Sequence, residues 1–149
     1  MTPAQDKPTT VLALTRKAQA ASFEQRVAGY ASLLADAGIE LTIQSWPRGW
    51  RAQRRMAMFS SAYDLVWWQR YLPAPWIAPM IRRHTRKLVF DFDDPVIYSS
   101  RKGGRRSLTR KLRFAAMLRH CDVALAASEH LAQIARPYCR DVRIVPMPI

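Results

Sequence analysis

The chain has 149 residues, of which 49% are apolar, 10% aromatic and 23% charged, and this length suits one domain with its own core and excludes two full domains. Its 24 Lys and Arg against 11 Asp and Glu give a formal net charge of +13, which favours anionic surroundings such as phosphate, nucleic acid or an acidic lipid surface. No apolar run approaches the ~18 residues of a membrane span, and the first ten residues do not resemble a secretory signal, so we predict a cytoplasmic protein.

Short apolar or β-branched runs alternate with segments of helical period, which predicts an α/β fold with a mostly parallel sheet. The first half predicts, in order, a strand at 9–15, a helix at 22–37, a strand at 39–46, a basic helix at 48–62 and a strand at 63–70. Ser22 is suited to cap the first of these helices, and Gly38 is suited to end it.

The second half continues the alternation with a short helix ending near residue 85, a strand at 87–94, a helix at 107–120 capped by Ser107, a strand at 122–128, a helix at 129–138 and a strand at 142–145. Residues 95–106 lack periodicity, so we predict a mobile loop there. We therefore expect residues 1–149 to form a single Rossmann-like, three-layer domain with about six strands. The final PMPI resembles the start of a connection, which favours the N-terminal half of a larger protein.

Cysteine and histidine do not predict a metal site in this sequence. Cys121 and Cys139 lie near the ends of two predicted helices, without the clustered histidines of a zinc site. We interpret both cysteines as packing residues. His84, His120 and His130 have no mutual spacing that would form a metal site.

Three acids lie at the end of the predicted strand at 87–94, where the sequence reads KLVFDFDD. Ligands gather outside the carboxyl ends of parallel strands, which selects Asp91, Asp93 and Asp94 as candidate catalytic residues. Alternation along the strand places Asp91 and Asp93 on one face, where their repulsion raises one pKa towards an acid–base value. The alternative is that these acids bond backbone N–H groups and offset the surrounding arginines.

Two basic segments are candidate anion or membrane contacts. In residues 101–113, seven of thirteen residues are Lys or Arg and none is acidic, and this segment supplies Arg101, Lys102, Arg105 and Arg106. The helix at 48–62 adds Arg51 beside Trp50, a pairing suited to a membrane interface. The alternative is that both segments are solvated helix faces.

Taken alone, LVFDFDDPV resembles the first motif of the haloacid-dehalogenase phosphatases. That resemblance implies Mg²⁺-dependent hydrolysis, with Asp91 as nucleophile, Asp93 as acid/base and Ser128 in a second motif. The family also uses a downstream Lys and an acidic pair, whereas this chain has no Lys after Ser128 and, besides Glu129, only Asp141 as an acid. The phosphatase is therefore the alternative interpretation.

A second resemblance covers essentially the whole chain. SFEQRVAGYASLLADAGIELTI, YDLVWWQR, KLVFDFDD, DVALAASEHLA and VRIVPMPI, in this order, resemble the N-terminal domain of GT-B glycosyltransferases, and more narrowly the retaining group-1, GT4-type family. The resemblance implies that this chain binds the sugar acceptor. It also implies that the nucleotide-sugar donor is held mostly by a second domain absent from this chain, with no cofactor in the chain itself.

The glycosyltransferase resemblance also implies site residues. Many relatives carry a His–Asp pair at the end of the fourth strand, where this chain has Asp93 and Asp94, and TRKAQAAS stands in place of the family's glycine-rich loop. The expected substrate-binding residues are Arg16, Ser22, Arg26, Ser128 and Glu129. We expect an anionic or lipid-linked acceptor at the inner face of a membrane. A third interpretation is a basic Rossmann-like module that binds nucleic acid or membrane, although no nucleic-acid motif is present.

Overall fold

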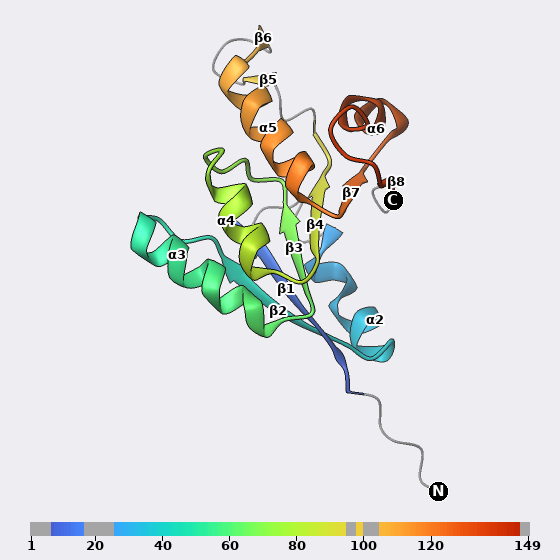
Figure 1. Ribbon diagram of the computed structural model, residues 1–149. Helices are drawn as coiled ribbons and strands as arrows, with labels where there is room; N and C mark the ends of the chain where they lie inside the picture. Colours follow the sequence, from blue (N-terminus) through green and yellow to red (C-terminus); the bar gives the residue numbers. More distant parts are fainter. Residues whose placement is uncertain (1–6, 17–25, 95–97, 100–104, 147–149) are drawn as a thin grey trace, which may run out of the picture.

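The structure is a computed structural model that describes residues 7–16, 26–94, 98–99 and 105–146 (Figure 1). It contains a six-stranded sheet, in which every neighbouring pair of strands is parallel, in the order β2-β1-β3-β4-β7-β8. These strands are β1 (Thr9–Thr15), β2 (Ile39–Ser45), β3 (Leu65–Gln69), β4 (Leu88–Phe92), β7 (Val123–Ala126) and β8 (Val142–Ile144). The predicted α/β, Rossmann-like class is confirmed.

Helices connect these strands. They are η1 (Ala28–Tyr30), α2 (Ala31–Asp36), α3 (Trp50–Phe59), η2 (Ser60–Ala62), α4 (Ile77–His84), α5 (Leu108–His120) and α6 (Glu129–Ala135). Figure 1 shows α3 and α4 on one side of the sheet and α2 on the other. Gly38 ends α2 with φ 78°, a left-handed conformation that glycine adopts without steric cost.

The larger core lies between the sheet and α3–α6. Alternate residues of β3 and β4 point into it, among them Trp68, Phe90 and Phe92, and each of these three is at most 1% exposed. Phe114 of α5 packs edge-on against Phe90 and Phe92, with ring centroids 6.1 and 5.2 Å apart. The other face of the sheet carries a smaller cluster around Ala13 and Val27. Because each face is covered by helices, the three-layer arrangement is confirmed.

Several predicted elements differ in the structure. The described part of the helix expected at 22–37 consists of η1 and α2, and the strand expected at 87–94 ends at Phe92, so Asp93 and Asp94 lie outside it. The helix expected at 48–62 is divided into α3 and η2, because the Ser60 and Ser61 hydroxyls donate to the carbonyls of Ala57 and Met58 and compete with the helical bonds. The loop expected at 95–106 contains an antiparallel pair, β5 (Tyr98–Ser99) with β6 (Arg105–Arg106). Strands of two residues are too short to produce an alternating pattern, which is why periodicity missed them.

The strand order reverses between β1 and β3, because the chain passes from β1 outward to β2 and then returns to the other side of β1. Open α/β sheets bind ligands outside the carboxyl ends of their strands at such a reversal. We therefore expect the functional site where β1, β3 and β4 end. Among the described residues, no helix has the length and apolar character needed to cross a membrane.

Candidate functional site

Polar side chains meet where β1 and β3 end. Thr15 is the last residue of β1 and Gln69 the last of β3, and the Thr15 hydroxyl donates to Gln69 Oε1 at 3.4 Å. Both side chains are buried. Gln69 is paired in register with Asp91 of β4, and register partners in a parallel sheet point to the same face. Three adjacent strands thus present polar groups on one face at the carboxyl end of the sheet.

Two hydrogen bonds and an ion pair hold Asp91 inside the protein. Its Oδ1 accepts a hydrogen bond from Arg26 Nε at 2.7 Å and lies 2.5 Å from Arg26 Nη2 in an ion pair, and its Oδ2 accepts a hydrogen bond from Trp67 Nε1 at 3.1 Å. The Asp91 side chain is 1% exposed and that of Arg26 2%. Burial raises the pKa of Asp91, and the hydrogen bonds from Arg26 and Trp67 oppose that rise. The charge of Asp93, on which the sequence argument relied, is the smallest of these causes.

The Arg26 guanidinium also donates through Nη1 to the backbone carbonyl of Val145, at 2.9 Å. Arg26 therefore joins the segment after β1 to β4 and to the end of β8. Sequence reasoning expected Asp91 to be catalytic and Arg26 to bind substrate. Their burial and mutual pairing give both side chains a structural contact, which corresponds to the alternative in which the acids offset nearby arginines.

Asp93 and Asp94 follow the end of β4 and have different surroundings. Asp94 pairs with Arg70 Nη2 at 2.5 Å, and both side chains are about half exposed. Asp93 is half-buried, and its Oδ1 has no hydrogen-bond partner in the described part of the chain. Among the three acids, Asp93 is thus the one whose carboxylate retains an unused buried oxygen.

Gln69 has a matching unused group. Its side chain is 2% exposed, and its Nε2 donor is buried without a partner among the described residues. Asp93 lies one residue after the end of β4 and two residues after Asp91, the register partner of Gln69, so Gln69 and Asp93 stand at the carboxyl ends of adjacent strands. A buried donor or acceptor left unpaired costs roughly 1–3 kcal/mol. One donor and one acceptor in this state suit a ligand hydroxyl, which accepts and donates.

The chain between β3 and α4 adds two further features. Arg70 has φ 60°, and it is the described non-glycine residue in the left-handed region, a conformation that clusters at functional sites. Its backbone N–H donates to the Asp91 carbonyl at 2.7 Å, which fixes this turn against β4. Beside it, the Tyr71 ring lies 5.0 Å from the Arg16 guanidinium carbon, so the exposed Arg16 is held at the same end of the sheet.

Ser128 and Glu129 lie at the carboxyl end of β7. The Ser128 hydroxyl accepts from the backbone N–H of Leu131 at 3.3 Å and caps α6. Glu129 pairs with Arg136 at 2.6 Å, and the hydrogen bond from Arg136 lowers the pKa of Glu129. These contacts give both residues a part in forming α6.

The structure describes the other candidate residues only in part or not at all. Ser22, Arg101 and Lys102 lie outside the described residues, and of Arg105 and Arg106 only the backbone strand β6 is described. No three His, Cys, Asp or Glu residues in the described ranges form a group that could hold a metal ion.

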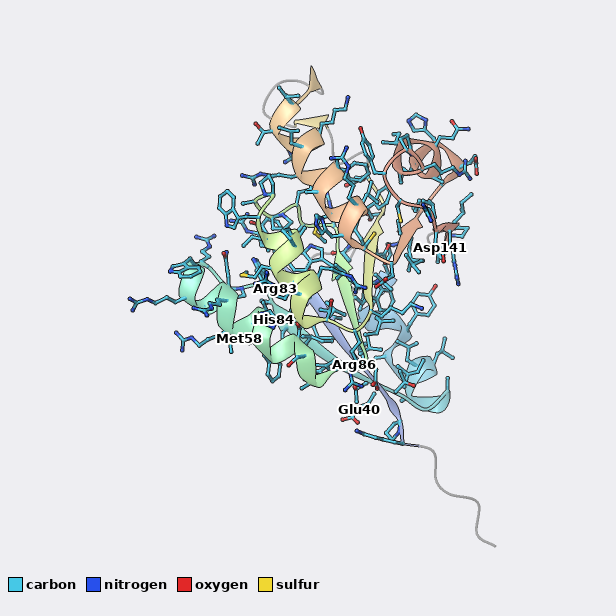
Figure 2. The ribbon with its side chains drawn as sticks, in the orientation of Figure 1. Glu40, Met58, Arg83, His84, Arg86 and Asp141 are labelled. Atoms are coloured by element: carbon cyan, nitrogen blue, oxygen red, sulfur yellow. The ribbon has the colours of Figure 1, made fainter. Side chains whose placement is uncertain are left out.

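A second surface lies on the outer face of α3. Trp50, Arg51, Arg54, Arg55 and Met58 recur at helical spacing and line a shallow hollow of about 390 Å³. Trp50 is 65% exposed and Met58 51%. The Arg54 guanidinium lies 5.8 Å from the Trp50 ring centroid. Figure 2 shows Met58 on α3 and Arg83 on the neighbouring α4.

Protein-family models and curated proteins give no match to this chain. The functional argument therefore depends on the residues themselves. Sequence reasoning missed Gln69, Arg70 and Tyr71, because it considered the ends of the first, second, fourth and fifth predicted strands and omitted that of the third. The signal was present in YDLVWWQR, where a polar Gln follows an apolar strand.

Proposed function

We propose that this domain binds the sugar acceptor in a GT-B glycosyltransferase of the retaining, GT4 type. The reaction transfers a sugar from a nucleotide-sugar donor to an anionic or lipid-linked acceptor. Support comes from the ordered sequence resemblance and from the placement of Asp93 after β4 at the carboxyl end of a parallel sheet. The nucleotide-sugar is bound mainly by a second domain, and this domain requires no cofactor.

The observation that carries the proposal is the pair of unused groups, Gln69 Nε2 and Asp93 Oδ1. A sugar hydroxyl accepts a hydrogen bond from the amide and donates one to the carboxylate, which removes both desolvation penalties. Glycosyl transfer also builds positive charge on the sugar ring, and a carboxylate beside the ring stabilises that charge. Asp93 therefore has both a binding and an electrostatic role in the proposal.

The phosphatase alternative is not favoured. It requires Asp91 to attack phosphorus, whereas the Asp91 carboxylate is 1% exposed and receives hydrogen bonds from Arg26 and Trp67 on both oxygens. An incoming phosphate ester would have to displace a buried ion pair, and breaking such a pair is strongly destabilising. The nucleic-acid alternative is supported by net charge alone.

An anionic membrane surface is the partner that the outer face of α3 favours. Residues 47–63 contain four arginines and no acid, and the arginines of α3 stand beside exposed Trp50 and Met58. Aromatic and thioether side chains enter the lipid headgroup region, while arginines pair with lipid phosphates. We propose that this face brings the domain to a lipid-linked acceptor at the membrane.

Isothermal titration calorimetry of the chain with a panel of methyl glycosides tests the proposed function. We expect at least one glycoside to bind, and Asp93→Asn and Gln69→Ala each to weaken its binding about tenfold or more, because each removes one hydrogen bond in a buried site. Glu129→Gln is the control and should bind normally, since Glu129 pairs with Arg136 on α6. Equal binding by all four proteins would contradict the proposed site.

A further inference from the structure

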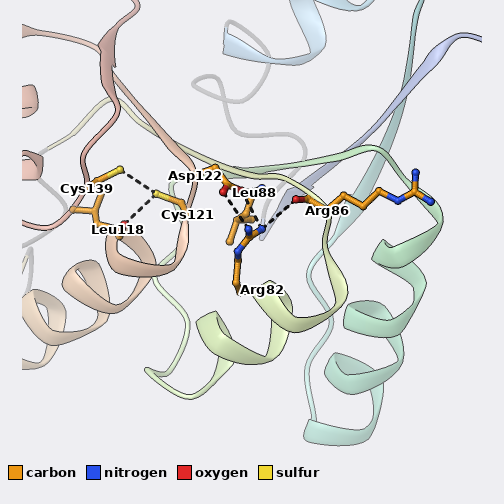
Figure 3. A network of polar contacts seen from close by, with 7 residues as sticks. All are labelled: Arg82, Arg86, Leu88, Leu118, Cys121, Asp122 and Cys139. Carbon is orange, nitrogen blue, oxygen red and sulfur yellow. Dashed lines mark hydrogen bonds and ion pairs between the residues drawn. The ribbon is translucent and has the colours of Figure 1, made fainter.

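The two cysteines lie side by side although they are 18 positions apart in the sequence. Cys121 follows α5 and Cys139 follows α6, and their sulfur atoms are 3.8 Å apart (Figure 3). Cys139 is 6% exposed and Cys121 is half-buried. Sequence analysis interpreted both as packing residues, and both do pack against the larger core. A disulfide has an S–S length of about 2.05 Å, so a shift of less than 2 Å would join them.

Hydrogen bonds hold the two thiols in this arrangement. Cys121 Sγ donates to the Leu118 carbonyl at 3.4 Å, and Cys139 Sγ donates to the Asp141 carbonyl at 3.5 Å (Figure 3 draws the first). The carbonyls belong to the segments that carry the cysteines, α5 and the turn before β8. Each sulfur is therefore positioned by a hydrogen bond to its own segment as well as by its contact with the other sulfur.

The two thiols differ in acidity, as a reactive and a resolving thiol must. The hydrogen bond from Cys121 lowers the pKa of Cys139 to about 7, and backbone hydrogen bonds at Asp141 and Ala124 act in the same direction. The same contact, burial and the nearby Asp122 raise the pKa of Cys121. The charge of Asp141 opposes the shift at Cys139 without reversing it. Cys139 is thus the thiol that ionises near neutral pH; once it has lost its proton it no longer donates to the Asp141 carbonyl and accepts from the Cys121 thiol across the 3.8 Å contact.

We propose that Cys121 and Cys139 form a redox-active dithiol, which a peroxide oxidises to an intramolecular disulfide. The Cys139 thiolate attacks one oxygen of hydrogen peroxide, which breaks the O–O bond, gives Cys139 sulfenic acid and releases hydroxide. The Cys121 thiol then attacks the Cys139 sulfur, the S–S bond forms, and water leaves with the sulfenic oxygen and the thiol proton. The protein loses two electrons and the peroxide gains them. A small oxidant suits this site because Cys139 is buried.

The disulfide would act on stability rather than at the candidate ligand site. Both cysteines precede strands, β7 and β8, so they lie at the amino ends of the sheet, opposite the ends that carry Gln69 and Asp93. Asp122, adjacent to Cys121, accepts from the Leu88 backbone N–H at 2.8 Å and pairs with Arg82 at 3.0 Å (Figure 3). The closed ring would include β7 and α6 and would tie them to this network.

Treatment of the full chain with hydrogen peroxide, followed by mass spectrometry and thermal unfolding, tests the proposal. We expect a loss of two hydrogens, a peptide pair joining Cys121 to Cys139, and a rise in Tm of about 5–10 °C that dithiothreitol reverses. Intermolecular dimers, or sulfinic acid at Cys139 with Cys121 still free, would overturn it.

Two variants separate a reactive pair from two packed thiols. Cys121→Ser keeps a hydrogen-bond donor and should leave a Cys139 sulfenic acid that a cyclic dione traps, with alkylation of Cys139 still rising near pH 7. Cys121→Ala removes the donor, so the pKa of Cys139, measured as the midpoint of its alkylation rate against pH, should move towards 9, the ordinary value for a thiol. Alkylation of Cys139 at pH 7 should then slow by up to roughly fifty-fold. Identical alkylation profiles in the wild type and both variants would overturn the proposal. That outcome would leave the proposed glycosyltransferase function untouched.

Discussion

At the scale of single residues, Arg26 and Asp91 form the most deeply buried ion pair in the described part of the chain. The pair joins β4 to the segment after β1, and Arg26 reaches the Val145 carbonyl as well. Removing one partner leaves the other charge uncompensated away from water. The cost of that loss greatly exceeds the cost of losing an exposed pair.

We therefore predict that Asp91→Asn and Arg26→Ala each lower the free energy of unfolding by about 3–5 kcal/mol in urea denaturation. Asp94→Asn, which breaks the half-exposed pair with Arg70, should cost less than about 1 kcal/mol. Should Asp91→Asn unfold at the wild-type urea concentration, the structural assignment of Asp91 would be wrong and a chemical role would regain support.

At the scale of elements, Asp64 fastens the start of β3 to β1. Its Oδ2 accepts from the backbone N–H of Thr10 at 2.9 Å and from the Thr10 hydroxyl at 3.1 Å, and its own N–H donates to that hydroxyl. The backbone bond from Thr10 is the largest cause that lowers the pKa of Asp64, followed by the bond from the hydroxyl. The folded state therefore favours the ionised carboxylate.

A lowered folded pKa gives stability that is fully present above the ordinary carboxyl value of 3.8 and is lost as pH falls through the folded pKa. We predict that Asp64→Asn has a lower free energy of unfolding than the wild type at pH 6, measured by urea denaturation. Its free energy of unfolding should also fall less steeply from pH 4 to pH 2. The exposed Asp36→Asn provides the control. An unchanged acid slope in Asp64→Asn would show that this contact does not couple β1 to β3.

Sequence periodicity predicted the elements whose pattern is long enough to read. β1 has the predicted bounds, and Ser107 caps α5 as predicted, because capping depends on residues three apart in sequence. The hairpin of β5 and β6 was missed because two-residue strands have no period. The pairing of Arg26 with Asp91 was missed because it joins residues 65 apart, and one sequence carries no record of that contact.

At the scale of the whole molecule, the net charge of +13 and the outer face of α3 point to an anionic surface. We predict that the chain binds vesicles containing phosphatidylserine and that high salt releases it. Replacing Arg51, Arg54 and Arg55 by Ala should weaken sedimentation with vesicles by roughly 100-fold, at about 1 kcal/mol for each basic residue near charged lipid.

A second triple variant, with the same net charge as the α3 triple variant, controls for non-specific attraction to the vesicles. Replacing the exposed Arg119, Arg136 and Arg143 by Ala removes three charges, one from α5, one from the residue that follows α6 and one from β8. This variant should retain most of the vesicle binding. Equal losses in the two triple variants would mean that net charge, and not the face of α3, determines attachment.

The nuclear magnetic resonance signals of the Gln69 side-chain amide test the central claim most directly, because the unpartnered Nε2 reports its own hydrogen bonding. During titration with the best-binding methyl glycoside, we expect these signals to shift in the wild type together with the backbone signals of Arg70 and Asp93, and to shift much less in Asp93→Asn. Saturable glycoside binding that leaves the Gln69 side-chain signals unmoved would contradict the account.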